Sequence, residues 1–157
     1  MKATLLITGQ NGQIATALQN AAEARGYCPI LLTRPSFDLG KPAALKAAMH
    51  AILERVAGST PAPIGLVNAA AYTGVDKAES EEDIAAHING VSPGVLAEAA
   101  AEFGIPFVHI STDYVFDGSK ASAYVETDPT APLGAYGRTK LMGEEAVRTA
   151  NPNALIL

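Results

Sequence analysis

The chain has 157 residues, of which 48% are hydrophobic and 17% are charged, as in a folded globular protein of about one domain. Its net charge of −5 leaves no basic surface for nucleic acid or acidic lipid, so neither is expected as a partner. The first apolar run is too short for a signal peptide, and no stretch approaches the ~20 apolar residues of a membrane span, which predicts a cytosolic location.

The N-terminal stretch predicts a strand over residues 4–7, a glycine turn and a helix. In the pattern Gly9-x-x-Gly12-x-x-Ala15, the glycines let the chain turn sharply and let a pyrophosphate approach, and the small third residue lets the helix pack close to the strand. The start of such a helix presents free N–H groups to phosphates. We interpret the stretch as a dinucleotide-binding turn; an ordinary strand-to-helix turn is the alternative.

Gly26 is expected to end the first helix, and residues 29–33 predict a second strand. In dinucleotide-binding folds an acidic residue at the end of this strand binds the adenosine ribose, whereas an arginine accommodates a 2′-phosphate. The strand ends here at Arg34, without a carboxylate, which favours NADP over NAD; a solvated surface arginine is the alternative. Cys28 stands beside an apolar run and is expected to be a buried structural thiol.

The middle of the chain predicts a brief extended segment over residues 36–39, a helix over 42–56 and a buried strand over 64–68. Residues 69–71, all alanine, follow this strand. Small residues at the carboxyl end of a strand leave room for a ligand in the crevice there, and they equally permit close helix packing.

An acidic run over residues 79–83 opens the next helical pattern, and carboxylates stabilise the first turn of a helix. We therefore interpret the run as a capping feature and not as a metal-binding cluster. Pro93-Gly94 inside the pattern predicts a kink or a local break after Asn89-Gly90. The histidines of the chain are far apart and lack ligand spacing, so no metal is predicted.

The last third of the chain predicts a strand over residues 106–111, a long loop over 118–134 that can close over a ligand, a helix over 135–150 and the beginning of a strand over 154–157. Strands and helices that alternate in this way predict a parallel sheet with helices on both faces. The expected fold class is therefore α/β, a Rossmann-like, doubly wound parallel sheet in three layers.

Three side chains carry the predicted chemistry. Thr112 follows the fourth strand, at the edge where open α/β sheets bind ligands, and its hydroxyl can orient a substrate oxygen. Tyr136 and Lys140 are four residues apart on the last helix, so they share one face. A nearby ammonium lowers the pKa of a phenol from its usual value of ~10, which makes the pair an acid–base candidate. A surface Tyr–Lys pair is the alternative.

Four stretches of the sequence resemble the extended short-chain dehydrogenase/reductases, and within them the reductases of 4-keto deoxysugar nucleotides. These stretches are Gly9-x-x-Gly12, Val67-Asn68-Ala69-Ala70-Ala71-Tyr72-Thr73-x-Val75-Asp76-Lys77-Ala78-Glu79, Ile110-Ser111-Thr112-Asp113-Tyr114-Val115-Phe116-Asp117-Gly118 and Tyr136-Gly137-x-Thr139-Lys140-x-x-Gly143-Glu144. The resemblance implies hydride transfer from NADPH, with NADH as the alternative cofactor, to the 4-keto carbon of a nucleotide-linked deoxysugar. Tyr136 would donate the proton, Lys140 would tune Tyr136 and hold the nicotinamide ribose, and Thr112 would position the carbonyl.

The candidate binding residues come from these patterns and from the resemblance. Those expected at the cofactor are Gly9, Asn11, Gly12, Gln13, Ile14, Arg34, Asp38, Leu39, Ala69, Ala70, Ala71, Tyr136 and Lys140. Those expected at the sugar nucleotide are Thr112, Asp113 and Tyr114. Asn89 matches the family's helix asparagine.

The sequence departs from the family pattern at three points. Ala15 replaces the third glycine, which is a tolerated change, and Gly94 stands where a helix-favouring residue is usual. Family members also continue for about as much chain again. We therefore expect residues 1–157 to be the NAD(P)-binding domain, ending within a strand and lacking the smaller C-terminal substrate lobe, with the activity of this chain left open.

Two other functions stay open. A sugar-nucleotide epimerase or dehydratase of the same superfamily shares the pattern, but the dehydratases carry a glutamate at the position of Tyr114. A non-catalytic NAD(P)-binding regulatory subunit would keep the fold without the activity, although all three candidate catalytic residues are present. The expected partner is a small-molecule sugar nucleotide, and a homodimer stays open as the assembly.

Overall fold

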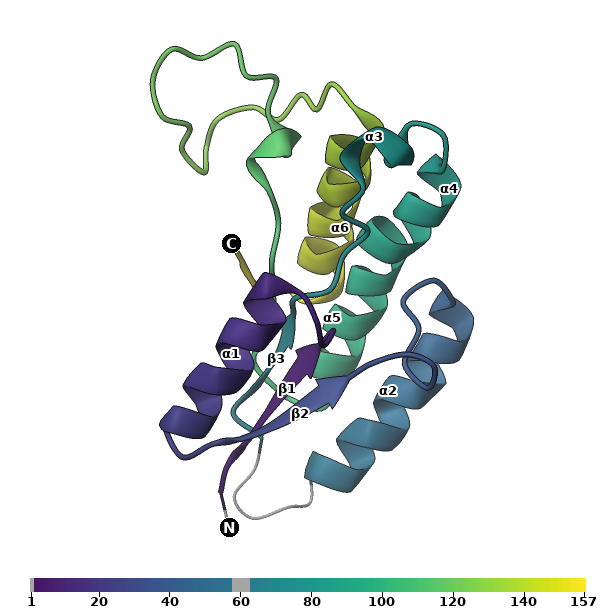
Figure 1. Cartoon of the computed structure of the whole chain (residues 1–157), viewed down its shortest axis with the longest axis vertical. Helices are drawn as coiled ribbons and strands as arrows, with labels where there is room; N and C mark the ends of the chain where they lie inside the picture. The colour runs from purple at the N-terminus through teal and green to yellow at the C-terminus, as the bar shows by residue number, and fades with distance from the viewer. Residues whose placement is uncertain (1, 58–62) are drawn as a thin grey trace.

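The computed structural model describes residues 2–57 and 63–157. Within them, five parallel strands form one sheet in the order β2-β1-β3-β4-β5 (Figure 1). The strands are β1 (Thr4–Thr8), β2 (Cys28–Leu32), β3 (Gly65–Asn68), β4 (Phe107–His109) and β5 (Leu155–Ile156). Because β1 has β2 on one side and β3 on the other, the strand order reverses at β1, and the crevice where such sheets bind ligands lies above the carboxyl ends of β1 and β3.

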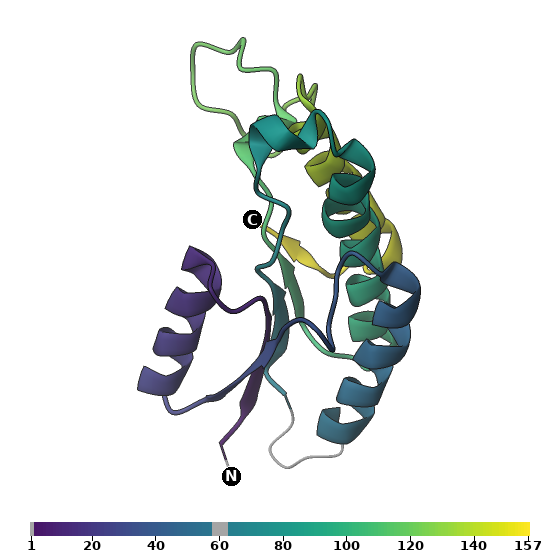
Figure 2. The same ribbon diagram turned by 45° about the vertical axis from the view of Figure 1, so that its right-hand side comes forward.

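Helices cover both faces of the sheet, so the predicted doubly wound α/β fold is confirmed. Helix α1 lies on one face against β1 and β2, while α2, α5 and α6 lie on the other (Figure 2). The helical segments are α1 (Gln13–Ala24), α2 (Pro42–Ala57), α3 (Val75–Ala78), α4 (Glu82–Ala85), the π-helical η1 (Ala86–Val91), α5 (Ser92–Glu102), the 3₁₀-helical η2 (Asp113–Val115) and α6 (Ala135–Ala150). Of the helices in the described ranges, none has both the length and the apolar character needed to cross a bilayer.

The main core fills the space between the sheet and the helices α2, α5 and α6. Alternate strand residues point into it, because successive side chains of a strand face opposite sides of a sheet. Its fully buried members include Leu6, Leu66 and Phe107 from the strands, Leu45, Met49 and Leu53 from α2, Leu96, Ala97 and Ala100 from α5, and Val147 from α6. This packing fixes α6, which carries the Tyr–Lys pair, behind the carboxyl ends of the central strands.

Two sequence predictions in the region of β2 are wrong. Residues 36–39 form turns and not an extended segment, because the Phe37 N–H donates to the Thr33 carbonyl at 3.0 Å and Phe37 and Leu39 bury their side chains in the core. Cys28 is exposed and not buried. The reason is its place at the first residue of β2, which is the edge strand of the sheet.

The helical pattern is irregular at the predicted place but does not break there: η1, which contains Asn89-Gly90, is π-helical, and the chain stays helical through Pro93 into α5. A π-helical turn is wider than a regular one, so its side chains point in other directions than in an α-helix. Such turns are frequent at functional sites. Here Asn89 is aimed at a neighbouring loop: its Oδ1 accepts the Tyr72 N–H at 2.8 Å, and its Nδ2 donates to the Tyr72 carbonyl at 3.1 Å. The Asn89 amide therefore holds the chain just beyond residues 69–71.

Glycines allow α6 to approach the η1–α5 helix closely. A Cβ on Gly143 would overlap the Asn89 carbonyl oxygen, and a Cβ on Gly94 would lie 2.9 Å from the Ala146 Cβ. Gly94, which departs from the family pattern, is thus explained by the close packing of α5 against α6.

We predict that Gly143→Ala destabilises the protein by about 1–3 kcal/mol, because the added methyl has no space beside the Asn89 carbonyl and α6 must shift. Gly12→Ala is the matched control, since nothing lies within 4 Å of a Cβ at that position. Its expected cost is below about 1 kcal/mol. Chemical denaturation compares the two, and equal midpoints would contradict the packing described above.

Candidate active site at the carboxyl edge of the sheet

The turn between β1 and α1 has the features of a phosphate cradle. Gly9 has φ = 89°, which favours glycine, and a Cβ there would already touch the Ala70 Cβ at 3.4 Å. Gly12 is the N-cap of α1, no side chain caps this end, and residues 12–14 are exposed. The first N–H groups of the helix therefore face outward, where a pyrophosphate group fits. Ala15 is buried beneath the turn, as its small size requires.

Thr8 connects this turn to residues 69–71. Its hydroxyl donates to Asn68 Oδ1 at 2.6 Å and accepts the N–H groups of Ala69 at 3.0 Å and Ala70 at 3.1 Å. Thr8 and Asn68 are 0% and 1% exposed, so these bonds form where an unpaired polar group would be costly. The two backbone segments predicted to line the cofactor are thereby held at a fixed separation.

His109 continues this buried polar row on β4. Its Nδ1 lies 3.0 Å from Asn68 Nδ2. Burial, and after it the charge of Lys140, lowers the pKa of His109 to about 3, so the ring is neutral at physiological pH. His109 is therefore a structural partner in the row and not an acid or base.

The residues expected near the adenosine follow the end of β2. Arg34 is exposed, and within residues 2–57 and 63–157 its side chain makes no ion pair or hydrogen bond. Asp38 Oδ1 accepts the Gly40 N–H at 3.0 Å, which closes a tight turn. Leu39 packs its side chain into the core and its carbonyl accepts a hydrogen bond from Ser92 Oγ at 2.6 Å. Arg34 is thus the side chain of this group that can reach a ligand.

Two of the three candidate catalytic side chains, Thr112 and Tyr136, lie close together where η2 packs against the start of α6. Thr112 is the N-cap of η2 and accepts the Tyr114 N–H at 3.3 Å. The Thr112 hydroxyl donates to Asp113 Oδ1 at 3.3 Å and lies near enough to the Tyr136 phenol to act on its pKa. The Tyr114 ring lies edge-on to the Tyr136 ring with centroids 5.6 Å apart. Gly137 allows this approach, since a Cβ there would overlap the Tyr114 carbonyl.

The sequence predicted that Lys140 lowers the pKa of Tyr136, and this prediction is wrong. The pKa of Tyr136 is raised, first by burial and further by the nearby Tyr114 and Asp113, while the Thr112 hydroxyl acts in the opposite direction. The Lys140 ammonium instead points to the end of β4, where its Nζ donates to the Ile110 carbonyl at 2.5 Å. Tyr136 is accordingly a protonated phenol at neutral pH, a proton donor and not a base.

Lys140 is among the most deeply buried residues of the chain, with 2% of its surface exposed. Burial lowers its pKa to about 8, and the carboxylate of Glu144 works against this effect. The ammonium is therefore still predominantly charged at pH 7, but it titrates within the range in which enzymes are assayed.

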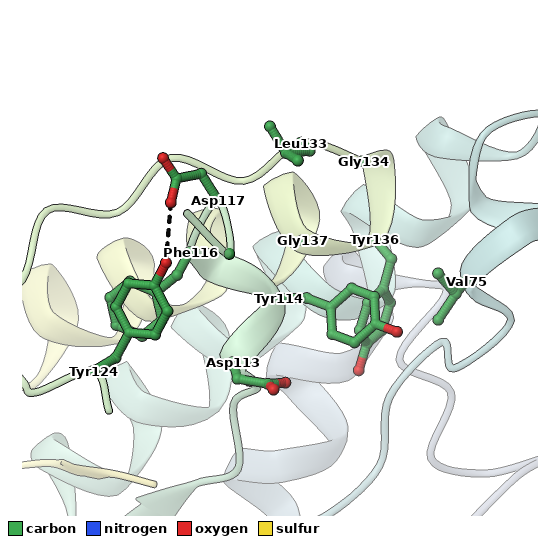
Figure 3. Close-up of a pocket in the computed structure, with 11 residues that line it drawn as sticks. Val75, Asp113, Tyr114, Phe116, Asp117, Tyr124, Leu133, Gly134, Tyr136 and Gly137 are labelled. Atoms are coloured by element: carbon green, nitrogen blue, oxygen red, sulfur yellow. Dashed lines mark hydrogen bonds between the residues drawn. The ribbon is translucent and has the colours of Figure 1, made fainter. Parts of the chain in front are cut away.

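A cavity of about 340 Å³ opens beside Tyr136, between η2, the loop over residues 118–134 and the start of α6 (Figure 3). One of its walls is aromatic: the rings of Phe116 and Tyr124 stack with centroids 4.2 Å apart, and the Tyr124 hydroxyl donates to Asp117 at 3.0 Å. Its lining residues are Val75, Asp113, Tyr114, Phe116, Asp117, Gly118, Tyr124, Leu133, Gly134, Tyr136 and Gly137. A sugar-sized ligand in this cavity would lie against the Tyr136 phenol.

The acidic run supports this site in a way that the sequence reasoning missed. Glu82 lies in the first turn of α4 as expected, but Glu79 caps a different helix: its Oε1 accepts the Ala135 N–H at the start of α6, at 2.7 Å. Glu82 then binds Arg138 on α6 through contacts of 3.0 and 2.9 Å. The carboxylates fix the helical turn that carries Tyr136. In the described part of the chain no group of three or more His, Cys, Asp or Glu residues could hold a metal ion.

Comparison with known proteins assigns the chain to a family. Residues 1–157 match the family described as RmlD substrate binding domain. The dTDP-4-dehydrorhamnose reductase of Sinorhizobium fredii is 49% identical over 154 residues, covering 98% of this chain and 48% of that protein. The enzyme of the same name from Escherichia coli is 40% identical over 147 residues, covering 92% and 46%.

Solved structures agree with these sequence relatives. The crystal structure of dTDP-4-dehydrorhamnose reductase from Bacillus anthracis in complex with NADP superposes with a TM-score of 0.87 at 31% identity, covering 99% of this chain and 52% of that one. The chain thus spans about half the length of the relatives it matches. The family resemblance in the sequence is confirmed, and the chain belongs to the RmlD substrate binding domain family, among relatives that are named dTDP-4-dehydrorhamnose reductases.

Proposed function

We propose that the protein reduces the 4-keto group of dTDP-4-dehydro-6-deoxy-L-mannose to give dTDP-L-rhamnose, with NADPH as the hydride donor. In this proposal residues 1–157 form the cofactor-binding part of the reductase and carry its proton donor. The observation that carries the proposal is the close approach of Thr112 to Tyr136 at the carboxyl edge of the sheet, beside an aromatic cavity and one helical turn from the buried Lys140. The names of the relatives supply the substrate.

The cofactor would lie across the switch point of the sheet. The open N-terminus of α1 and the Gly9 turn fit its pyrophosphate, and the alanines of residues 69–71 leave space along it. Arg34, exposed at the end of β2, would pair with a 2′-phosphate. The bound cofactor would supply the hydride to the keto carbon.

The chain's own residues would supply the proton. Tyr136 is protonated at neutral pH because its pKa is raised, so it donates to the ketone oxygen as the hydride arrives at the carbon. The Thr112 hydroxyl would stabilise the phenolate that remains. In this proposal the positive charge of Lys140, one helical turn along α6 and bonded to the Ile110 carbonyl, would act on the same site from a distance. Thr112 would also hydrogen-bond the ketone and orient it.

Tyr136→Phe is expected to lower kcat by about 10²–10⁴-fold, because it removes the proton donor and nothing else. The dissociation constant for NADPH should stay within about twofold, since the ring remains. Steady-state NADPH oxidation with the 4-keto sugar nucleotide measures the first quantity, and fluorescence titration of NADPH measures the second. A parallel loss of turnover and of NADPH binding would assign Tyr136 a structural role.

Arg34→Ala is expected to weaken NADPH binding by about tenfold, roughly 1.4 kcal/mol, while NADH binding stays unchanged. The reason is that the two cofactors differ only in the 2′-phosphate, which Arg34 is placed to meet. Arg25→Ala is the control, because Arg25 is an exposed arginine at the opposite end of α1. Calorimetric titration of both cofactors gives the ratio, and an unchanged NADPH-to-NADH ratio would remove Arg34 from the site.

The pH–rate profile should have one region in which turnover falls, and this alkaline limb should lie above pH 8. With a pKa of about 8, Lys140 loses its charge as the pH rises above 8, while Tyr136, with its raised pKa, remains protonated. Turnover should therefore be level below about pH 7 and fall above pH 8. A pH–rate profile tests this, and a profile that stays level to pH 9.5 would contradict a role for the Lys140 charge.

A further inference from the structure

Helix α6 carries a stripe of four residues of which the proposed function uses only two. Tyr136, Lys140, Glu144 and Arg148 follow one another at intervals of four, so they lie on one face of the helix. The stripe runs from the half-buried phenol to the exposed guanidinium of Arg148, whose side chain is 59% exposed. Glu144, by contrast, is 5% exposed, which is unusual for a carboxylate.

Glu144 and Lys140 together hold the chain segment that leads into Thr112. The Lys140 Nζ donates to the Ile110 carbonyl at 2.5 Å, and the Ser111 hydroxyl donates to Glu144 Oε1 at 2.5 Å. The second carboxylate oxygen accepts from Arg148 Nη2 at 2.7 Å. Two successive turns of α6 thus grip two successive residues of the strand exit, and the next residue is Thr112. The contact fixes the distance between the Thr112 hydroxyl and the Tyr136 phenol, because these groups lie on the two gripped elements.

Glu144 also balances the buried ammonium. The titratable group that faces Lys140 from another element is His109 on β4, which is neutral, and Asp113 on η2 is exposed. On α6 itself Tyr136 is protonated. The Glu144 carboxylate is the charge that opposes the effect of burial on Lys140.

We propose that Glu144 is a positioning residue of the site, which clamps residues 110–112 to α6 and places its carboxylate one helical turn from the buried Lys140 ammonium. Its catalytic consequence rests on the proposed function, but its effect on Lys140 does not. Glu144 touches neither of the groups that would react; it acts through Ser111 and Lys140.

The first test is the titration of Lys140 itself, followed by NMR of ¹³Cε-labelled lysine and assigned with Lys140→Arg. Glu144→Gln keeps the shape of the side chain and its hydrogen bond to Ser111 but removes the charge, and it should move the Lys140 midpoint to lower pH by about one pH unit. Glu145→Gln is the matched control, since it makes the same change one residue away on the exposed side of α6 and should leave the midpoint in place. An unmoved midpoint in Glu144→Gln would overturn the proposal, whether or not the protein is a reductase.

The second test concerns turnover in the complete protein. Glu144→Gln should shift the alkaline limb of the pH–rate profile by the same interval as the NMR midpoint, with the NADPH dissociation constant within about twofold. Ser111→Ala keeps the charge and removes the clamp, so kcat should fall about tenfold while the limb stays in place; this variant also tests the clamp if Glu144→Gln fails to fold. The positioning role would be refuted if Ser111→Ala kept the kcat of the wild type, or if Glu144→Gln left the alkaline limb of the pH–rate profile in place. If the wild-type protein is inactive but Glu144→Gln still shifts the Lys140 midpoint, the proposed function alone is refuted.

Discussion

The structure depends on the burial of one ammonium group. Lys140 is 2% exposed, and taking such a charge out of water costs on the order of several kcal/mol unless partners replace the water. The partners are the Ile110 carbonyl and the charge of Glu144. The Ile110 contact requires α6 to lie directly against the exit of β4, so the ammonium and the strand end fix each other's position. The glycine at 143 makes room for this approach, because any side chain there would collide with the π-helical segment.

Buried polar groups also hold the backbone in place at the ends of β1 and β3. The buried side chains of Thr8 and Asn68 hydrogen-bond each other, and the Thr8 hydroxyl also accepts the N–H groups of residues 69 and 70. Buried polar groups that are fully paired specify one arrangement of the backbone, because a shift of either strand would leave a donor unsatisfied. The carboxyl edge is therefore built from polar contacts at the ends of strands whose other residues are apolar. A rigid edge of this kind suits a reaction in which proton donor and hydride donor must approach one substrate carbonyl together.

The sequence predicts the architecture because its signals are local. The glycine turn after β1 and the helical periodicity of α2 and α6 each depend on neighbouring residues alone, and the structure agrees with them. Cys28 was predicted wrongly because its exposure depends on the strand order, which no local pattern contains. Residues 36–39 were predicted wrongly because Phe37 and Leu39 pack into a core that is built by other elements, which favours turns there. The pKa of Tyr136 was predicted in the wrong direction for a related reason: four-residue spacing places Lys140 on the same face, but the Ile110 carbonyl, far away in sequence, decides where the ammonium points. Glu79 and Glu144 accept hydrogen bonds from Ala135 and Ser111, which are far away in sequence, so their roles were equally hidden.

The central claim is that hydride and proton meet at one keto group held at this edge. The most direct measurement uses NADPH deuterated at the transferred position of C4, with dTDP-4-dehydro-6-deoxy-L-mannose as the acceptor, and analyses the product sugar by mass spectrometry and NMR. The account predicts one deuterium at C4 of the rhamnose ring and none elsewhere. A product without deuterium at C4, or deuterium retained in the cofactor while the substrate is consumed, would contradict it.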